Sequence, residues 1–446
     1  MAPLGARFTD HPLSSKPLQL ILVTQVLLAV GCGQAFSDSG IASVGADVFL
    51  SSLGVNIHVD QGVSGGSYVA PLRYLGVRNV RDNGRNSSQF QLIHQRTGVR
   101  LDLVGVGDLE ETISTSKTLA ASGALMAFEG PNEPNNWPIT YIGQSGGGMG
   151  SWAPVAQFQE ALYRAVKSDP NLQQYPVFAV SEAGAEIDNV GLQFLTIPTG
   201  AGATFPDGTR YADYANTHNY VTSNRKMYID NQAWNAADPT LSGPWDGLLG
   251  EYGITWRHHY RGYTKEQLLT LPRVTSETGW DSVSDIGGER TQGTILVNTY
   301  FAQFKRGWRY TFIYQLRDGE GGNGNQGLFN SNSTPKSAAT YIHNLTSILA
   351  DNIPVASPGF LNYSILDEPA TVHDLLIQKS SGTFELVVWD EKVKGTDQVT
   401  VNLGRTYSRV NIYDVTIGIS PTQTLSNVAS VSLNLTDHAL IIEILN

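Results

Sequence analysis

Residues 127–137 read AFEGPNEPNNW, and this stretch takes an apolar run directly into a polar turn. The run 125–128 is apolar enough for a strand that is covered on both faces, as in a parallel sheet. Pro131 and Pro134 flank the pair Asn132 and Glu133 and restrict the backbone where these side chains leave the sheet. The stretch therefore predicts a buried strand that ends at a site, with the Glu133 carboxylate held in place.

A lone Asn-Glu-Pro is also a common polar turn, so the prediction depends on a second stretch. Residues 273–280 read RVTSETGW and repeat the arrangement: a short β-branched run, a glutamate (Glu277), and then a glycine and an aromatic residue. Two glutamates at two strand ends make a carboxylate pair. Such a pair is the minimum equipment for cleaving a glycosidic bond, because one carboxyl protonates the leaving oxygen and the other acts at the anomeric carbon.

Strand and helix patterns alternate along residues 52–345, which favours a parallel sheet. No Gly-x-Gly-x-x-Gly turn follows the first strand, so the pattern favours a (β/α)8 barrel over a dinucleotide-binding sheet. One intervening helix is expected from Trp152 to Val166, with Ser151 as its cap. The eight expected strands are Ser52–His58, Val77–Arg81, Arg100–Val106, Leu125–Glu129, Val177–Val180, Tyr214–Tyr220, Arg273–Ser276 and Tyr310–Tyr314.

The spacing between the two glutamates exceeds that of three minimal strand–helix units of about 30 residues each. The excess falls in 186–213 and 221–272, which are rich in Gly, Pro, Asn and Trp. We expect both segments to be long loops on the catalytic face that shape a substrate cleft.

From about Asp351 the pattern changes to short alternating runs such as Phe384–Trp389, Val399–Leu403 and Ala439–Ile444. This spacing predicts an antiparallel β-sandwich at 346–446, for which a structural role is expected before ligand binding. Residues 36–51 are predicted to be a linker that can add a strand to the sandwich.

The pairing of Asn132-Glu133-Pro134 with Ser276-Glu277-Thr278-Gly279-Trp280 resembles the clan A (4/7 superfamily) glycoside hydrolases over residues 53 to about 345. That resemblance is specific for the clan and assigns no single family. It implies a barrel with the acid/base after strand four and the nucleophile after strand seven, often followed by a β-sandwich domain. By motif match, Glu133 is the expected acid/base, Glu277 the nucleophile, and Asn132 the residue that hydrogen-bonds the sugar 2-hydroxyl.

Further residues match positions that the clan uses around the nucleophile. Arg81 ends strand two, and Tyr220 ends strand six in a His-x-Tyr motif that includes His218. Donors here would keep a nucleophilic carboxylate ionised. Alternatively, Arg81 pairs with Asp82 or Asp102, and His218 is a packed core imidazole.

Aromatic residues beside the two glutamates are candidates for stacking on the flat C–H faces of sugars. They are Trp137 and Trp280, and His58 at the end of strand one joins the candidate substrate-binding set. Tyr314 stands where the clan often has an aromatic platform after strand eight. The stretch Asp318–Asn325 has alternating oxygen ligands but lacks the closing glutamate of a calcium loop, so it is expected to be a substrate loop. The resemblance requires no cofactor and no metal.

A formal net charge of −11 over 446 residues argues against a nucleic-acid or anionic-membrane partner and favours neutral or basic ones. The resemblance implies that the partner is a carbohydrate. Residues 1–35 have a basic residue, an apolar run and then small residues, the order of a cleaved secretory signal. Cleavage is expected after Ala35, or before Cys32 if Ala29–Cys32 serves as a lipoprotein signal with a lipid anchor at Cys32. The expected location is therefore secreted or periplasmic, or the cell surface if the chain is lipidated. Cys32 is the sole cysteine, so the chain contains no internal disulfide.

The sequence as a whole predicts a retaining β-glycoside hydrolase that cleaves poly- or oligosaccharides by double displacement. Two alternatives are a non-catalytic carbohydrate-binding surface protein on the same barrel and a transglycosylase, which differs only in its acceptor. Sugar identity, endo or exo action and oligomeric state depend on loops whose course the sequence does not give.

Overall fold

The computed structural model describes residues 40–183, 192, 194–201, 205–222, 232–233, 262–264, 267, 270–283, 288–322, 324–392 and 394–445. The predicted signal segment 1–35, part of the predicted loop 186–213 and most of the predicted loop 221–272 lie outside these residues. Among the residues described, no helix is long and apolar enough to cross a membrane.

Eight parallel strands form the central sheet, in the order β10-β13-β14-β3-β4-β5-β6-β9. Parallel bridges from Phe178 to Tyr214 and from Ala183 to His218 join the two outer strands, so the sheet closes as a barrel. The predicted fold class is confirmed. The strands are β3 (Leu53–Asn56), β4 (Asn79–Asp82), β5 (Arg100–Val104), β6 (Leu125–Glu129), β9 (Val177–Phe178), β10 (Ala215–His218), β13 (Arg273–Thr278) and β14 (Trp308–Ile313).

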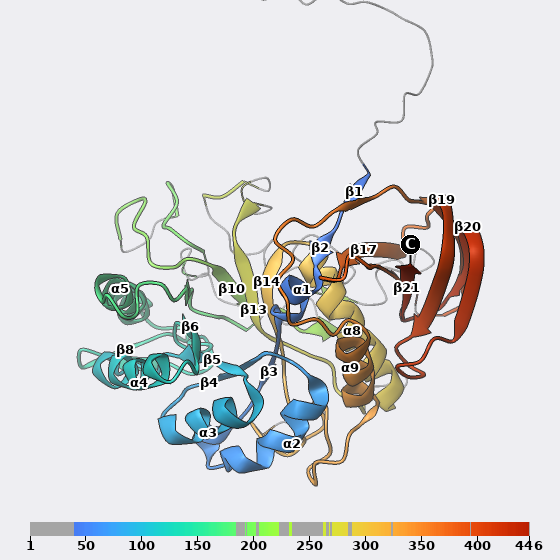
Figure 1. Cartoon of the computed structure of the whole chain (residues 1–446). Coiled ribbons are helices and arrows are strands. Elements are labelled where there is room, and N and C mark those ends of the chain that lie inside the picture. The colour runs from blue at the N-terminus through green and yellow to red at the C-terminus, as the bar shows by residue number, and fades with distance from the viewer. Residues whose placement is uncertain are drawn as a thin grey trace, which may run out of the picture. The chain divides into compact units, whose positions relative to one another are not determined.

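Helices surround these strands, as Figure 1 shows. They are α2 (Gly65–Leu75), α3 (Ser87–Thr97), α4 (Leu109–Ala121), α5 (Ala153–Ser168), α8 (Gly288–Lys305) and α9 (Ser337–Ile348). Shorter elements are α1 (Ala46–Leu50), the 3-10 turn η1 (Val59–Gln61), the hairpin β7–β8 (Ile139–Tyr141 and Gln144–Gly146) and the pair β11–β12 (Val221–Thr222 and Gln232–Ala233).

The start of α5 differs from the prediction, because Trp152 and not Ser151 is the N-cap. The Ser151 hydroxyl still accepts a hydrogen bond from the Ala153 amide at 3.2 Å, but Ser151 lies one residue before the N-cap position. Pro154 lies in the first turn of the helix, where its missing N–H costs nothing.

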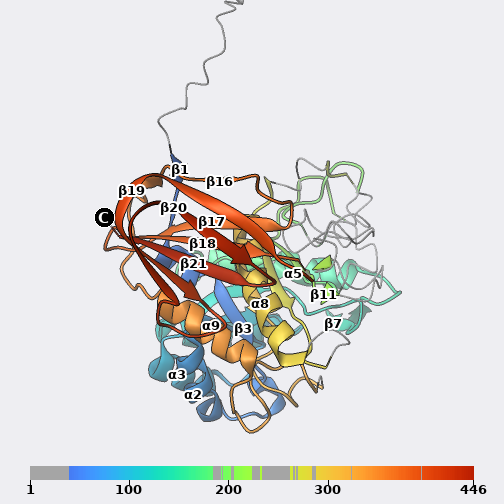
Figure 2. The same ribbon diagram turned by 90° about the vertical axis from the view of Figure 1, so that its right-hand side faces the viewer.

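The C-terminal sheet has the order β16-β19-β21-β18-β17-β2, with β20 paired to β19, and Figure 2 shows these strands beside α8 and α9. Its strands are β2 (Val44–Gly45), β16 (Ser364–Leu366), β17 (Val372–Gln378), β18 (Phe384–Asp390), β19 (Asp397–Asp414), β20 (Gln423–Leu435) and β21 (Ala439–Leu445). All are antiparallel to their neighbours except β2, which runs parallel to β17. A separate pair joins β1 (Ile41–Ala42) to β15 (Phe360–Leu361).

The alternation along β18 explains how the sandwich attaches to the barrel. Leu386 and Val388 point into the sandwich's own core, while Val387 and Trp389 belong to the core cluster of the barrel. Side chains of a strand alternate between faces, so one strand serves both cores. The Trp389 ring stacks on Phe301 of α8 at 5.8 Å between centroids.

Candidate active site

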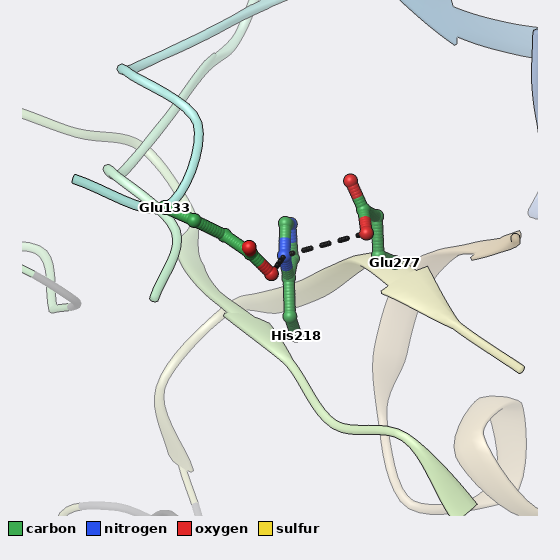
Figure 3. A group of neighbouring side chains, drawn as sticks. All are labelled: Glu133, His218 and Glu277. Atoms are coloured by element: carbon green, nitrogen blue, oxygen red, sulfur yellow. Dashed lines mark hydrogen bonds and ion pairs between the residues drawn. The ribbon is translucent and has the colours of Figure 1, made fainter. Parts of the chain in front are cut away.

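The carboxyl ends of the barrel strands bring Glu133 and Glu277 together, and Figure 3 shows both carboxylates pointing towards His218. A carboxylate oxygen of each glutamate and a ring nitrogen of His218 all lie within 4.8 Å of one another. Glu133 follows β6, His218 ends β10 and Glu277 lies near the end of β13. Three segments that are far apart in sequence therefore build one site.

The backbone at Glu133 is strained in a way that its sequence explains. Its φ of +39° lies in the left-handed region, which costs a residue with a Cβ about 1 kcal/mol or more. The carbonyl oxygen of Glu133 accepts from the amides of Asn136 and Trp137, both at 2.8 Å, so a tight turn holds this conformation. Strain of this kind occurs where a side chain must be aimed.

Close packing also constrains the stretch after Glu277. A Cβ on Gly279 would lie 2.6 Å from the carbonyl oxygen of Tyr314, so only glycine fits between the ends of β13 and β14. The glycine of the predicted motif thus serves the approach of two strands beside the site.

Arg81 is the hub of the hydrogen bonds under the site. Its Nε and Nη2 donate to the two oxygens of Glu129 at 2.6 and 2.8 Å, a bidentate pair. Nη1 donates to Glu277 Oε1 at 2.6 Å and to Asn56 Oδ1 at 2.9 Å. Nη2 also donates to Asn132 Oδ1 at 2.8 Å.

These contacts decide between the two sequence-based interpretations of Arg81. It pairs with Glu129 and Glu277, while the predicted alternative partner Asp102 acts on it only through its charge. Burial disfavours the guanidinium charge, but the charges of Glu129 and Glu277 outweigh it and raise the pKa of Arg81. Burial likewise opposes the charge of Glu129, yet Arg81 lowers the pKa of that carboxyl. Both groups are therefore ionised at neutral pH.

Glu277 has a second donor from the strand-six motif. The Tyr220 hydroxyl donates to Glu277 Oε2 at 2.8 Å. Burial, and next the charge of Glu277, raise the pKa of Tyr220 well above its usual value, so its hydroxyl keeps the proton that it donates. Glu277 thus has one donor on each oxygen, and it is 8% exposed.

Glu133 has different partners. Its Oε1 lies 2.6 Å from Nδ1 of His218, and its Oε2 accepts a hydrogen bond from the side-chain amide of Asn136 at 3.1 Å. His218 is fully buried, and its Nδ1 also lies 3.6 Å from Glu277 Oε2. Burial opposes a charge on the ring, but the charge of Glu277 and then the hydrogen bond from Glu133 raise the pKa of His218. The two neighbouring carboxylates therefore favour the protonated form of the His218 ring.

The aromatic candidates have different surroundings. Trp137 is 66% exposed directly after the Glu133 turn, so its ring is available to a ligand. Trp280 is 4% exposed and belongs to the barrel core cluster, which corrects its prediction as a stacking platform. The aromatic spacing in the sequence could not separate the two, because both follow a glutamate turn.

His58 and Tyr314 lie together on the same edge of the barrel. Their rings are 5.5 Å apart in a T-shaped contact, and the Tyr314 ring is 6.3 Å from that of Tyr220. His58 Nδ1 meets the side-chain amide of Gln61 at 3.2 Å, while its Nε2 is buried without a hydrogen-bond partner among the residues described. Tyr314 thus provides an aromatic ring close to Tyr220, the tyrosine that donates to Glu277.

Two ion pairs hold the predicted substrate loop Asp318–Asn325 against its neighbours. Asp318 pairs with Lys336 at 2.5 Å and accepts from the Gly327 amide at 2.8 Å. Glu320 pairs with Arg317 and accepts from the Tyr68 hydroxyl at 2.7 Å. Asn323, within the predicted stretch Asp318–Asn325, lies outside the described residues.

Three contacts of the site have no counterpart in the predictions: those of Asn56, Asn136 and Ser276. The Ser276 hydroxyl lies 3.0 Å from Nε2 of His218 and donates to Glu129 Oε1 at 3.0 Å. Neighbours on a regular strand point to opposite faces, so a regular strand would not bring both Ser276 and Glu277 into one site. The pairing of β10 with β13 shifts register between Thr217 and His218, and this irregularity admits both.

No family model and no curated protein matches the sequence. Solved structures are similar in fold. A family 39 glycoside hydrolase from Bacteroides cellulosilyticus WH2 has a TM-score of 0.54 at 14% identity, over 91% of this chain and 83% of that one. CelM2, a bifunctional glucanase-xylanase from a metagenome library, has 0.53 at 12%, over 91% and 97%.

A third similar structure is the family 51 α-L-arabinofuranosidase from Thermotoga petrophila RKU-1, with a TM-score of 0.55 at 9% identity, over 92% of this chain and 98% of that one. At these identities the likeness concerns the fold. The chain therefore has the barrel-and-sandwich fold of clan A glycoside hydrolases, the fold that the two glutamate motifs predicted.

Proposed function

We propose that the protein is a retaining glycoside hydrolase in which Glu133 is the acid/base and Glu277 the nucleophile. The observation that carries this proposal is the short separation of the two carboxylates, with oxygens within 4.8 Å. Retaining enzymes hold their carboxyl groups about 5–5.5 Å apart, whereas inverting enzymes leave about 6.5–9.5 Å for a water molecule.

The partners of each glutamate support the division of roles. A nucleophile must be ionised, and Glu277 accepts from Arg81 and Tyr220, which both favour the carboxylate. An acid/base must exchange a proton, and Glu133 shares a short hydrogen bond with His218, whose pKa is raised. Burial opposes the charge of Glu133, but the hydrogen bond and charge of His218 outweigh it and lower the pKa of that carboxyl, so the exchangeable proton belongs to the Glu133–His218 pair.

The double displacement then follows from this arrangement. A Glu277 oxygen attacks the anomeric carbon while Glu133 gives its proton to the leaving glycosidic oxygen. A water molecule next gives a proton to Glu133, and its oxygen replaces Glu277 at the anomeric carbon. Asn132 supports both steps, because its carbonyl oxygen is bonded to Arg81 and its amide nitrogen remains to donate to a sugar hydroxyl.

The substrate that we propose is a β-linked poly- or oligosaccharide. The exposed Trp137 ring beside the acid/base favours a carbohydrate on the leaving-group side. One of the similar structures is an α-L-arabinofuranosidase, so this linkage belongs in the substrate panel.

A non-catalytic carbohydrate-binding protein on the same barrel is the competing function. Binding of a neutral sugar does not require two adjacent carboxylates, and burying these charges is unfavourable unless they are used or paired. The complete set of partners around Glu133 and Glu277 therefore favours catalysis over binding.

The test is turnover on aryl β-glycosides, aryl α-L-arabinofuranosides and β-gluco, manno, xylo and galacto polysaccharides. The variant E277Q serves as the inactive control, and E160Q on the outer surface of α5 as the matched active control. Proton NMR during early turnover of a β-glycoside should show the β anomer first. Release of the α anomer would contradict retention, and binding without turnover of any substrate would favour the competing function.

A further inference from the structure

A chain of hydrogen bonds runs from the acid/base into the floor of the barrel. Glu133 Oε1 meets His218 Nδ1 at 2.6 Å, and His218 Nε2 meets Ser276 Oγ at 3.0 Å. Ser276 Oγ then meets Glu129 Oε1 at 3.0 Å. Arg81 holds both Glu129 oxygens, so the chain ends on a fixed ion pair.

The chemistry of Ser276 gives this chain a direction. A hydroxyl has one hydrogen, and Ser276 has two neighbours that could accept it: Glu129 Oε1 and His218 Nε2. An ionised carboxylate accepts a stronger hydrogen bond than a neutral imidazole nitrogen. The Ser276 hydrogen therefore goes to Glu129, and Ser276 accepts the hydrogen that Nε2 of His218 must carry.

We propose that Ser276 is a positioning residue that keeps a hydrogen on Nε2 of His218, so that Nδ1 and Glu133 Oε1 share the single proton delivered to the glycosidic oxygen. This proposal rests on the proposed function for the fate of that proton. The tautomer itself follows from the contacts of Ser276 alone.

Proton balance over the reaction is consistent with this arrangement. Before the reaction, Glu133 and His218 together hold one proton besides the Nε2 hydrogen. Glu133 passes that proton to the leaving oxygen as the glycosidic C–O bond breaks and the Glu277 bond to carbon forms. Nδ1 of His218 and Oε1 of Glu133 then face each other with lone pairs at 2.6 Å, which raises the affinity of the pair for the proton of the attacking water.

The charged groups around His218 come from four strands or their ends. Glu133 and Glu129 come from β6 and its end, and Glu277 lies on β13. Arg81 on β4 opposes a positive charge on the ring, and the Tyr220 hydroxyl after β10 binds Glu277. None of these groups contacts Nε2 by a described hydrogen bond, so Ser276 is the contact that selects the tautomer.

Removal of the Ser276 hydroxyl should reverse the tautomer. In S276A, Nε2 loses its acceptor, and the neutral ring is expected to carry its hydrogen on Nδ1 and donate it to the Glu133 carboxylate. Donation to the charged form favours that form, so Glu133 should lose its acidic proton at lower pH. The loss of one hydrogen bond of about 1–1.5 kcal/mol corresponds to a displacement of about one pH unit.

The first measurement needs no turnover. Imidazole ¹⁵N NMR of ¹⁵N-histidine-labelled protein distinguishes the two tautomers, and loss of signals in H218Q assigns His218. The wild type and S276T, which keeps a hydroxyl, should retain the Nε2 hydrogen at high pH, whereas S276A should carry it on Nδ1. A wild-type ring with its hydrogen on Nδ1 and none on Nε2 would overturn the proposal.

The second measurement is the pH profile of kcat/KM on a natural linkage and on an activated aryl glycoside. In S276A the alkaline limb of kcat/KM on the natural linkage should move to lower pH by about one unit. At a pH on that limb, kcat/KM should therefore be about tenfold lower than in the wild type. The activated substrate needs little protonation, so its first step should change much less. S276T should restore the profile, and S116A, which removes a buried hydroxyl in α4, should leave it unchanged.

If S276A does not fold, S276C replaces it, because a thiol is a weaker acceptor than a hydroxyl. An equal loss of kcat/KM on both substrates, with the alkaline limb of the pH profile unmoved, would show a merely structural role for Ser276 and overturn the proposal. If the wild type turns over no glycoside, the proposed function fails, and the NMR result still decides the tautomer.

Discussion

Nη1 of Arg81 lies 2.6 Å from Oε1 of Glu277, while the other edge of the same guanidinium is fixed on Glu129. Glu129 thus fixes the position of the guanidinium, and Glu277 accepts a hydrogen bond from Nη1 of the same group. Glu129 is fully buried and both of its oxygens bind Arg81, so its charge serves to orient that guanidinium. Glu277 therefore faces a donor whose orientation is fixed by a second ion pair.

Replacement of Arg81 by lysine should lower kcat by about 10²–10³-fold, because an ammonium cannot bridge Glu129, Glu277 and Asn132 in one plane. Steady-state kinetics on an aryl glycoside measure the loss. R73K, at an exposed arginine that bonds a backbone carbonyl, is the matched control. Unchanged kcat in R81K would show that charge alone, without the bidentate geometry, is sufficient.

Removal of the Tyr220 hydroxyl should have a smaller effect than R81K. Y220F deletes a hydrogen bond to a charged group, which is worth about 1.5–3 kcal/mol, so kcat/KM should fall roughly 10–100-fold. Y163F on α5 serves as the control, and an unchanged kcat/KM in Y220F would show that the Tyr220 hydroxyl does not assist Glu277.

The fold could be predicted because its signals are local and repeated. Apolar runs such as Leu125–Phe128 recur with helices between them, and the nearly continuous apolar run Phe384–Trp389 suits a strand that is buried on both faces. Short elements had weaker signals: β9 is confined to Val177–Phe178, and the long β20 was not predicted. Its first eight residues are largely exposed, and only Val431, Leu433 and Leu435 at its end alternate as buried apolar residues, which is a short signal for so long a strand.

The site was predictable only where a motif places a residue at a strand end. Arg81, His218 and Tyr220 met the two glutamates because parallel strands share one carboxyl edge. Ser276 was missed because its inward direction depends on a register shift between β10 and β13. The two residues in contact there, His218 and Ser276, are 58 residues apart, and no local sequence pattern predicts such a shift. Burial of Trp280 depends equally on distant packing.

A histidine outside the site should make stability pH-dependent. His438 lies 3.0 Å from Asp414 and 3.3 Å from Asp437, and Asp437 pairs with Arg290 of α8. Burial favours the neutral ring, but the two aspartates outweigh it and raise the pKa of His438 from 6.5 to about 9. A raised folded-state pKa stabilises the protein below the unfolded value, and this stability is lost as pH rises through about 9.

H438Q should therefore lower the free energy of unfolding by about 1–3 kcal/mol near pH 6 and by much less above the folded pKa. Thermal unfolding at both pH values measures the difference. H94Q is the control, because the His94 ring bonds a backbone carbonyl and no carboxylate. An equal loss at both pH values would assign the effect to packing.

The mature protein is predicted to begin near Cys32 or Phe36, because residues 1–35 have the charged, apolar and small regions in secretory order. We propose export on this basis. Intact mass of protein recovered from outside the cytoplasm checks the prediction, and a lipid adduct on Cys32 would establish an anchored form. A mass that retains residues 1–29 would contradict it.

The two glutamates should fail in different ways, since one supplies a proton and the other forms a covalent bond. E277A should lose nearly all turnover whatever the leaving group, because no glycosyl-enzyme can form. E133A should keep its first step on an activated aryl glycoside but lose roughly 10²–10⁴-fold on natural linkages, the usual share of general-acid catalysis.

Azide then distinguishes the two roles by stereochemistry on a β-glycoside. In E133A the glycosyl-enzyme still forms on Glu277, and azide attacks it without needing a base, so the product is the β-glycosyl azide. In E277G the small side chain leaves room for azide at the position of the missing carboxylate, and direct attack with Glu133 as the acid gives the α-glycosyl azide. Proton NMR of the products identifies each anomer, and E160Q should form neither. If both variants gave the same anomer, the assignment of Glu133 as acid/base and Glu277 as nucleophile would be wrong, whereas an exchanged pair of anomers would reverse the two roles.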